Sequence, residues 1–512
     1  MLPSILPLVL FLRIQPASSL AVDVSSLLNA SAVSALSPAV SITTISSTET
    51  CDNIHTCRTL YSIVQTCLAT IFACVWVAVH RNIPGPKARA SRSSNLVISS
   101  AQWLWATILD QRQSVIVFLV TLLVPEWILA WAIRQAILAQ QLTTELEDAR
   151  RDAKELWEKG IAEHAAERNA EKPEEGNRST GVSMRGSSED EAPLIERRLA
   201  SSNMNVMDPE DRLAWTHAKR FAKLSQAWTI VHAFFVIMGG YHAYDEDGPL
   251  YPLDPDEVVS LVRDGKLIPP STDELANQSK GDFLSKGIAI LQTIWFVVQC
   301  LARLAEHLPI TNLEVMTLAY TVMTVAMYVA WWHKPLNISC AIRAPAVASE
   351  KQVEVKVAWE RFLNYVMGSP DDDVDLRSLQ RVPTFWAGQP DIDDVTKADA
   401  IALVVAMAFG AVHCLAWDYT FASHTERLLW RVSAVAIIAV PAGILLFLLL
   451  IKIERWGFEY VGGILGVVFV FVGAPLYICA RTILLVFSFT TLTSLPHSIY
   501  QIVQWTEFIP HI

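Results

Sequence analysis

The feature that most constrains this chain is a series of apolar runs long enough to cross a lipid bilayer. Residues 59–79 hold 21 consecutive positions without an acidic or basic side chain, bounded by Arg58 and His80. A helix needs about 20 apolar residues to cross ~30 Å of hydrocarbon. Hydrocarbon accepts a backbone only when its amides are hydrogen-bonded within the structure, which favours helices. The sequence therefore predicts an all-α protein that crosses a membrane several times.

Further runs of this kind follow along the chain. Each is long or apolar enough to be considered as a span, although residues 115–133 are interrupted by Pro125 and Glu126 and residues 482–495 are short. We expect about 8–9 transmembrane helices, the others being residues 224–241, 287–302, 315–332, 400–417, 432–451 and 461–480.

Charge is sparse and unevenly distributed. The chain is 52% hydrophobic and 18% charged, and its charges gather in residues 134–223, 244–286 and 334–397. A soluble domain carries about 25% charged residues, so this pattern indicates a multi-pass membrane protein with polar loops. The net charge of −11 argues against a nucleic-acid partner, since nucleic acids bind basic surfaces.

The composition divides the chain into segments. Residues 1–21 predict a signal peptide, although no basic residue precedes their apolar core, and an uncleaved anchor is the alternative. A Ser/Thr-rich extracytoplasmic arm and one long charged linker are expected around the membrane regions. The boundaries are 22–57 for the arm, 58–139 for a transmembrane hairpin region, 140–223 for the linker, 224–332 for transmembrane helices, 333–397 for a polar loop and 398–512 for C-terminal transmembrane helices.

Four of the eight cysteines lie within residues 51–74. Cys67 and Cys74 fall inside the first apolar run and Cys51 and Cys57 outside it, so the four cannot converge on one metal without breaking the helix. We predict no metal site, and a local disulfide between Cys51 and Cys57, with Cys340 as a competing partner.

The side that each loop faces is ambiguous in the sequence. The basic residues of 81–92 predict a cytoplasmic loop, yet the linker after residue 134 is also basic, and one span between them would place the two on opposite sides. Either residues 95–109 join 115–133 as a re-entrant hairpin, which we favour, or the linker is extracytoplasmic. The hairpin would place residues 244–286 and 334–397 on the lumenal side, where sequons Asn277 and Asn337, like Asn29 in the arm, are candidate glycosylation sites.

The linker begins with a charged segment that predicts a helix continuing out of the membrane. Favourable i,i+4 pairs support it, and leucines and alanines repeat at 4-3-4-3 spacing for two heptads. We expect residues 142–170 to form this helix and to be a possible site for a protein partner, followed by disorder in residues 172–208.

Three ionisable residues lie within the expected spans. Glu126 is expensive at membrane depth unless it is paired or hydrated, and Pro125 predicts a broken helix beside it. His232 and His413 could join Glu126 in a candidate intramembrane polar site for an ion or proton. The structural alternative is a neutral Glu126 hydrogen-bonded within the bundle, with the histidines bonded likewise.

The sequence offers little chemistry for an enzyme. It lacks G-x-x-x-x-G-K-[ST], G-x-S-x-G and H-E-x-x-H, and it predicts no cofactor. His242 and Asp247 form an H-x-x-x-x-D pair similar to the catalytic pair of glycerolipid acyltransferases, but so short a motif also arises by chance.

Several blocks resemble one family. CRTLYSIVQTCLATIFACVWVAVHRNIPGP, PEWILAWAIRQ, WTIVHAFFVIMGGY, LPITNLEVMTLAYTVMTVAMYVAWWHKPLNISC and WTEFIPHI are similar to blocks of uncharacterised multi-pass membrane proteins of fungi. The resemblance implies a fungal membrane protein with a charged, variable linker, and implies no reaction. We expect the protein in the plasma membrane or a secretory-pathway membrane. The function we favour is a transporter- or channel-like bundle around Glu126. The alternatives are a membrane-bound lipid-modifying enzyme and a membrane scaffold acting through the linker.

Overall fold

The computed structural model describes residues 57–85, 114–170, 223–246, 248–279, 282–346, 374–453 and 468–504. Within these ranges the chain is mostly helical, and six helices are long and apolar enough to cross a membrane. They are α2 (Leu60–Phe72) continued by η1 (Ala73–Val77), α10 (Asp282–Ala305), α11 (Asn312–Ala330), α13 (Ile392–Val412) continued by η3 (His413–Ala416), α14 (His424–Ile453), and η4 (Phe469–Gly473) continued by α16 (Ala474–Thr490) and η5 (Thr491–Ser494).

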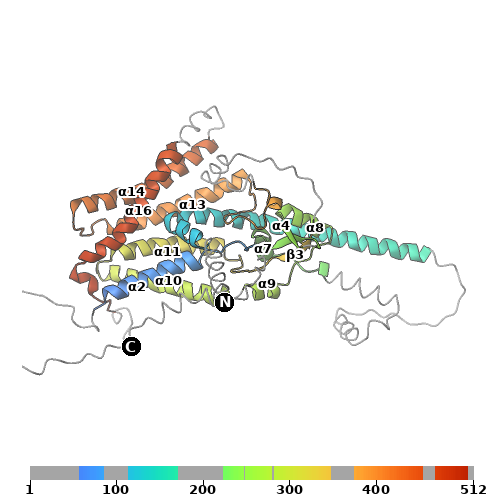
Figure 1. Ribbon diagram of the computed structural model, residues 1–512, viewed down its shortest axis with the longest axis horizontal. Coiled ribbons are helices and arrows are strands. Elements are labelled where there is room, and N and C mark those ends of the chain that lie inside the picture. The colour runs from blue at the N-terminus through green and yellow to red at the C-terminus, as the bar shows by residue number, and fades with distance from the viewer. Residues whose placement is uncertain are drawn as a thin grey trace, which may run out of the picture.

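These helices form one bundle with two distinct ends (Figure 1). We call the end at which α2 begins the arm face, and the other end the linker face. At the arm face Arg58 pairs with Glu314 near the start of α11, and Arg303 near the end of α10 donates to the carbonyl of Gln501. At the linker face the start of α13 meets α4, through the bond from Gln141 to Asp394. Successive helices therefore alternate in direction between the two faces.

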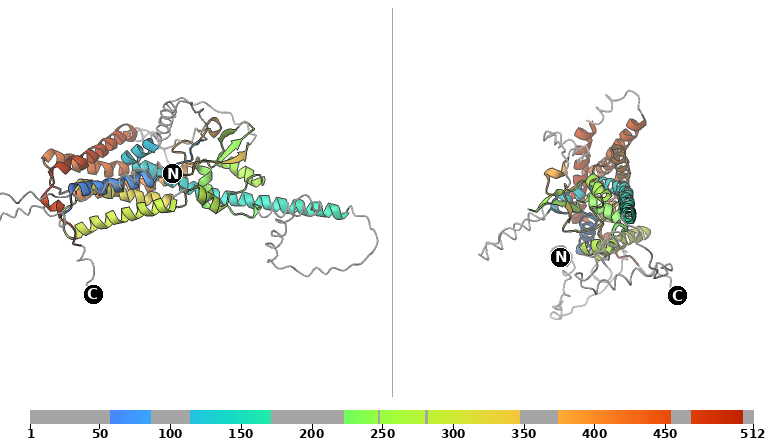
Figure 2. Two further views of the ribbon diagram at one scale, coloured as in Figure 1. Left: turned by 60° about the horizontal axis from the view of Figure 1, so that its bottom comes forward. Right: turned by 90° about the vertical axis from the view of Figure 1, so that its right-hand side faces the viewer.

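The polypeptide between α2 and α7 enters the bundle and turns back. The helix Ser114–Leu123 and helix α4 (Pro125–Ala170) meet at a bend of 111°. Ser114 accepts a bond from Arg81, just beyond α2, which fixes the first arm at the linker face. Helix α4 leaves the bundle at the same face and extends well past it (Figure 2). The pair is therefore a re-entrant hairpin and not a span.

A small α/β module covers the linker face. It contains α7 (Ile230–Ile237), α8 (Pro255–Arg263), α9 (Thr272–Gln278), the short helix η2 (Leu376–Ser378) and a three-stranded sheet in the order β2-β1-β3. Strand β1 (Tyr241–Tyr244) is antiparallel to β2 (Pro249–Pro252) and parallel to β3 (Ile342–Pro345). Helices α7 and α8 both pack on α4, so the module is attached to the outgoing arm of the hairpin.

Local sequence explains where several helices begin. Thr311 caps α11 by accepting from the backbone N–H of Glu314, and the Glu314 carboxylate accepts the Thr311 N–H in return, at 2.8 Å. Ser271 and Glu274 form the same reciprocal cap on α9. Each cap satisfies two helix-terminal donors that would otherwise be unpaired.

The structure corrects the expected number of spans. Residues 224–241 were expected to cross the membrane, but they contain α7, only 8 residues long, and lead into the sheet. The runs 461–480 and 482–495 were expected as two elements, but Phe471–Ser494 forms one candidate span. Residues 224–241 are apolar because most of them are buried inside protein, and hydropathy alone does not distinguish such burial from contact with lipid.

The expected sidedness is also wrong in one respect. Because α7 does not cross, residues 244–279 and 374–391 lie at the same face as the linker helix, and Arg263 of α8 pairs with Asp152 of α4 at 3.5 Å. The hairpin was placed at 95–109 with 115–133, but its two arms are Ser114–Leu123 and α4, while residues 86–113 lie outside the described part of the chain.

Candidate functional site

The tip of the hairpin is the point where the backbone is irregular deep inside the bundle. Pro125 has no N–H to donate, and the chain changes direction between Val124 and Pro125. The carbonyls of Leu122 and Leu123 consequently lack the helical donors that would follow them. Backbone of this kind is tolerated at membrane depth only where it is enclosed by protein or lines a water-filled cavity.

Arg481 of helix α16 supplies the missing hydrogen-bond donors. Its Nη2 atom donates to the carbonyl of Leu122 at 3.1 Å and its Nε atom to that of Leu123 at 3.3 Å. The hydroxyl of Tyr320 on α11 also donates to the Leu122 carbonyl. Arg481 is 2% exposed, and its guanidinium lies 4.1 Å from the centre of the Phe409 ring. Helices α11, α13 and α16 thus hold the hairpin tip together.

Glu126 lies in the first turn of α4, beside this guanidinium. The Arg481 charge and the Tyr477 side chain both act on its carboxyl group. The N-terminus of a helix is its positive end, so a carboxylate in the first turn is further stabilised there. Glu126 is half-buried overall, but its Oε2 atom is inaccessible and has no partner within hydrogen-bond geometry.

Four buried polar atoms around the tip lack a hydrogen-bond partner. They are Oε2 of Glu126, Oη of Tyr477, Nη1 of Arg481 and Nε2 of His413. Buried polar groups are normally satisfied by protein or by bound water. The Glu126 carboxyl, the Tyr477 phenol and the Arg481 guanidinium lie together and have free positions that can bind water, a small polar solute or an ion, whereas His413 lies beyond the Phe409 ring.

The predicted site residues are only partly brought together. His413 donates through Nδ1 to the Phe409 carbonyl, 3.0 Å away, and the Phe409 ring lies between it and Arg481. His232 lies elsewhere, in α7 of the linker-face module, where it bonds Thr229 and the carbonyl of Pro270. It was predicted to lie within a span, and that is wrong because α7 does not cross the bundle.

Sequence reasoning missed Arg481, Tyr320 and Tyr477. Arg481 was treated as a boundary between two apolar runs, whereas it lies near the middle of the span Phe471–Ser494. A lone arginine flanked on both sides by apolar residues was the signal that could have identified it. Arg134, two turns along α4 from Glu126, forms an ion pair with Asp399 at 2.6 Å.

A second buried polar cluster lies at the linker face, around Lys334. Its Nζ atom donates to the His80 carbonyl at 2.5 Å, to Gln135 at 2.8 Å and to Asn82 at 3.2 Å. The ammonium also lies 4.7 and 4.8 Å from the ring centres of Trp131 and Trp331. Burial lowers the pKa of Lys334 well below its ordinary value of 10.5.

The same cluster fixes the hairpin to the loop before α13. The Trp386 carbonyl accepts bonds from Gln135 at 2.7 Å, Trp131 at 2.9 Å and Asn82 at 3.2 Å. Trp131 and Gln135 are on α4, one to three turns from Glu126. The polar cluster therefore holds the outgoing arm of the hairpin at a fixed position.

Other predicted sites are placed as follows. Cys57 is disulfide-bonded, while the expected partner Cys51 and sequon residue Asn29 lie outside the described residues. The competing Cys340 has a free thiol. Asn277 and Asn337 are exposed, both near the linker face. The described residues hold no group of three or more His, Cys, Asp or Glu that could bind a metal.

Comparison with known proteins yields one match. Residues 205–401 match a family described as "Family of unknown function (DUF8562)". The matched region covers the linker-face module together with α10, α11 and the start of α13. No curated protein matches the chain, and no solved structure matches it. The resemblance to fungal membrane proteins stays a prediction.

Proposed function

We propose that the protein is a multi-pass membrane protein of the plasma membrane or secretory pathway, whose bundle moves a small ion or polar solute past the hairpin tip. The membrane assignment is supported by the outer surfaces of the helices. Large apolar side chains are exposed along α10, α13, α14 and α16, including Leu291 at 69%, Leu446 at 57% and Val404 at 54%. Contact with lipid accounts for such surfaces, which a water-soluble monomer rarely carries.

The transport proposal is carried by one observation, the broken hairpin whose tip meets a buried arginine and glutamate. Transporters and channels bind their solutes near the bilayer midplane, where helices are interrupted and where helix ends and free carbonyls are available. Here the interruption, the α4 N-terminus and three unsatisfied polar atoms, those of Glu126, Tyr477 and Arg481, coincide. The hairpin enters the bundle from the linker face, so movement of α4 would open or close access for a solute from that face to the tip.

Flux measurements with Glu126→Gln test this proposal. The purified protein is reconstituted in proteoliposomes, and proton and monovalent cation fluxes are followed with internal dyes under an imposed gradient. We expect the wild-type chain to carry a flux that Glu126→Gln largely abolishes while the variant remains folded. Glu158→Gln is the matched control, because Glu158 lies on the same helix with its side chain 52% exposed. A flux that Glu126→Gln leaves at the wild-type level would refute the proposal, as would a wild-type protein without flux.

We further propose that the arm face is lumenal or extracellular and the linker face cytoplasmic. Arg81 and the basic side chains of α4, such as Arg150 and Arg151, lie at one face, which the positive-inside rule assigns to the cytoplasm. Cys57 and Arg58 precede α2 at the other face. The disulfide at Cys57 fits an oxidising compartment there.

The two other functions have less support. His242 is buried in β1, where its backbone pairs with β2, and Asp247 lies outside the described residues. For the scaffold function, the apolar stripe of α4 is already covered inside the molecule from Leu142 to Ala153, and of the stripe only Leu156 is exposed. A partner for residues 142–170 therefore stays a prediction.

A further inference from the structure

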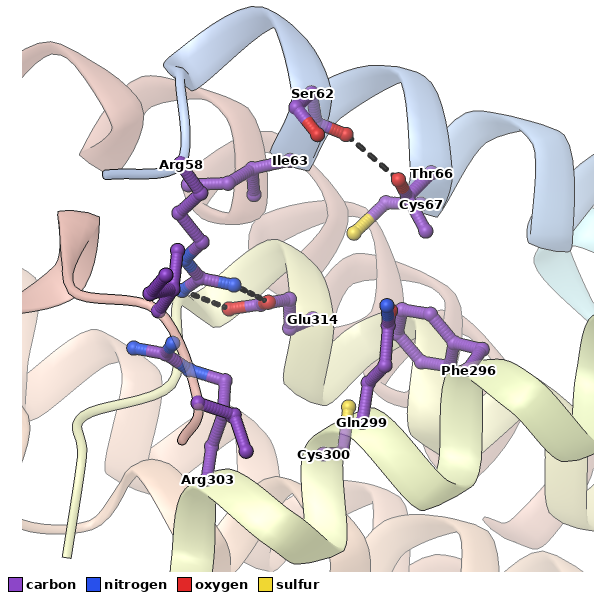
Figure 3. Close-up of a pocket in the computed structure, with 12 residues that line it drawn as sticks. Arg58, Ser62, Ile63, Thr66, Cys67, Phe296, Gln299, Cys300, Arg303 and Glu314 are labelled. Carbon is purple, nitrogen blue, oxygen red and sulfur yellow. Dashed lines mark hydrogen bonds and ion pairs between the residues drawn. The ribbon is translucent and has the colours of Figure 1, made fainter. Parts of the chain in front are cut away.

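A cavity of about 150 Å³ opens at the arm face, away from the hairpin tip. It lies between α2, α10 and the start of α11, and Ile502 and Val503 of the C-terminal segment cover it. Figure 3 shows the side chains around it. A space of this size holds on the order of ten water molecules, or a ligand group of similar bulk.

The two ends of the cavity differ in polarity. Arg58, Arg303 and Glu314 line the outer end, at the ends of the helices. Phe296, Cys67 and Cys300 line the inner end and are each 2% exposed or less. The cavity thus passes from charged to apolar over the depth at which a bilayer passes from headgroups to acyl chains.

Positive charge predominates at the outer end. Arg58 donates to the carboxylate of Glu314, so this pair is neutral. Arg303 is 2% exposed and its bonds go to backbone carbonyls, those of Pro309, Ile499 and Gln501. Two carboxylates act electrostatically on Arg303. Glu314 is already paired with Arg58, and Glu306 accepts a hydrogen bond from the backbone N–H of Gln504. The cavity wall itself carries two guanidinium groups and one carboxylate.

Uncommitted hydrogen-bond donors also face the cavity. The Gln299 amide points into the space between α2 and α10, as do the sulfurs of Cys67 and Cys300 (Figure 3). The described residues offer the Gln299 amide no bonding partner, and the hydroxyl of Ser62 at the mouth is likewise unused. The Gln299 amide and the Ser62 hydroxyl are therefore available to a ligand's polar head.

The cavity borders a surface suited to lipid. On α10, Leu301 is 56% exposed, Ile294 55% and Trp295 48%. An amphiphile in the adjacent leaflet would need to move only sideways to enter. A free polar anion without an apolar chain would lose water against the apolar inner end and gain no hydrogen bonds there in return.

We propose that this cavity binds a single-chain anionic amphiphile, with its carboxylate or phosphate beside Arg303, Arg58 and Gln299 and its chain against Phe296, Cys67 and Cys300. The guanidinium groups and the amide supply charge-assisted hydrogen bonds to the head. Burial of the first methylenes supplies the rest of the affinity, at about 0.8 kcal/mol for each CH₂. This site is separate from the hairpin tip and does not depend on transport.

Photocrosslinking of the full-length chain in nanodiscs tests the proposal. The probe is a fatty acid that carries a diazirine near its carboxylate, and the modified residues are located by peptide mapping. We expect crosslinks on α2 and α10 at positions that line the cavity. Oleate and lysophosphatidate should both displace the probe, and uncharged monoolein should do so about tenfold more weakly, because a charge-assisted bond is replaced by a neutral one. Equal displacement by monoolein would overturn the charge assignment, and displacement by inorganic phosphate alone would overturn the amphiphile.

Cys300→Phe fills the inner end of the cavity and should remove these crosslinks. Leu301→Phe is the matched control, since it adds an aromatic ring at the next residue, on the lipid-exposed side of the same helix. Crosslinking that survives Cys300→Phe, or that falls equally in Leu301→Phe, would contradict the proposal. If Cys300→Phe does not fold, Gln299→Leu provides the second variant, because Gln299 is only half-buried and its loss should weaken oleate more than monoolein.

Discussion

The guanidinium of Arg481 donates to the backbone carbonyl of Leu122 at 3.1 Å, although 359 residues separate the two in the sequence. The bond joins the last long helix of the chain to the tip of the re-entrant hairpin. An arginine inside an apolar helix is expensive unless its donors are used, and free carbonyls inside a bundle are expensive unless they find donors. Each feature stabilises the other. This explains why a charged residue can lie in α16 and why the helix can be interrupted just before α4.

Arg481→Met should therefore destabilise the folded protein strongly. The substitution leaves the Leu122 and Leu123 carbonyls without the guanidinium and leaves Glu126 without a neighbouring positive charge. Removing one partner from a buried network of this kind costs about 3–5 kcal/mol. The free energy of unfolding, measured by denaturant titration in detergent, should fall by about that amount. Thr482→Ala is the control, since Thr482 is exposed on the same helix and bonds only its own backbone turn, and it should change stability by less than about 0.5 kcal/mol. Equal stability of Arg481→Met and wild type would show that the arginine does not hold the hairpin.

Lys334 should make stability depend on pH. Burial lowers its pKa in the folded state well below the 10.5 of the unfolded chain. Between these two values the unfolded chain binds more protons, so the free energy of unfolding should rise with pH, by at most about 1.4 kcal/mol per pH unit, and level off above 10.5. Neighbouring His80 does not obscure this effect, because its pKa is lowered well below 6.5 and it stays neutral across the alkaline range.

The comparison of Lys334→Met with wild type isolates this contribution. Unfolding is measured in detergent at intervals from pH 7 to pH 10. The wild-type slope should be largely lost in Lys334→Met and kept in Lys266→Met, whose side chain is 60% exposed and pairs with Asp264. A slope that persists in Lys334→Met would assign the pH dependence to another group.

Glycan occupancy should report the two faces of the bundle. Asn277 and Asn337 lie near the linker face together with α4, whereas Asn29 belongs to the arm that precedes α2. If the arm face is lumenal, only Asn29 is accessible to the glycosylation machinery. Expressed in a eukaryotic host, the protein should lose its glycosidase-sensitive mobility shift in Asn29→Gln and keep it in Asn277→Gln and Asn337→Gln. A glycan on Asn337 would reverse the assignment of the faces.

Most of the long apolar helices could be predicted from the sequence. The runs beginning near residues 59, 287, 315, 400 and 432 all correspond to candidate spans, because a 20-residue apolar window reflects a length requirement that does not depend on tertiary contacts. The elements that could not be predicted depend on such contacts. Residues 224–241 are apolar because α7 and β1 are buried between α4 and the rest of the linker-face module, and hydropathy is the same for burial in protein and in lipid.

The site was only partly predictable for a related reason. Pro125 and Glu126 marked the broken helix in the sequence, since proline cannot donate and a carboxylate at depth needs a partner. The partner itself, Arg481, comes from a helix more than 350 residues away, and no local pattern connects the two. The direction of the second arm also depends on the bend, which proline permits but does not determine. Cys67 was placed only within the first apolar run, and it is the fold that brings it to the same cavity as Cys300.

Gly388 should be required for the loop before α13 to dock on α4, and its replacement by alanine tests how firmly the hairpin is held. Its φ angle is +90°, a conformation that residues with a Cβ atom adopt at a cost of about 1–3 kcal/mol. The added Cβ would also lie 2.5 Å from Cδ2 of Leu138 on α4. Gly388→Ala should therefore lower the unfolding midpoint and raise hydrogen exchange of the Trp131 and Gln135 side-chain donors that bond the Trp386 carbonyl. Gly160→Ala is the matched control and should raise stability instead of lowering it. Nothing lies within 4 Å of the position that its added methyl group would occupy. Alanine in a helix is more stable than glycine by about 0.5–1 kcal/mol. If Gly388→Ala is as stable as wild type, the docked loop is not what fixes α4, and the contacts of Lys334 with Gln135 and of Arg481 with the hairpin tip must hold the hairpin in place.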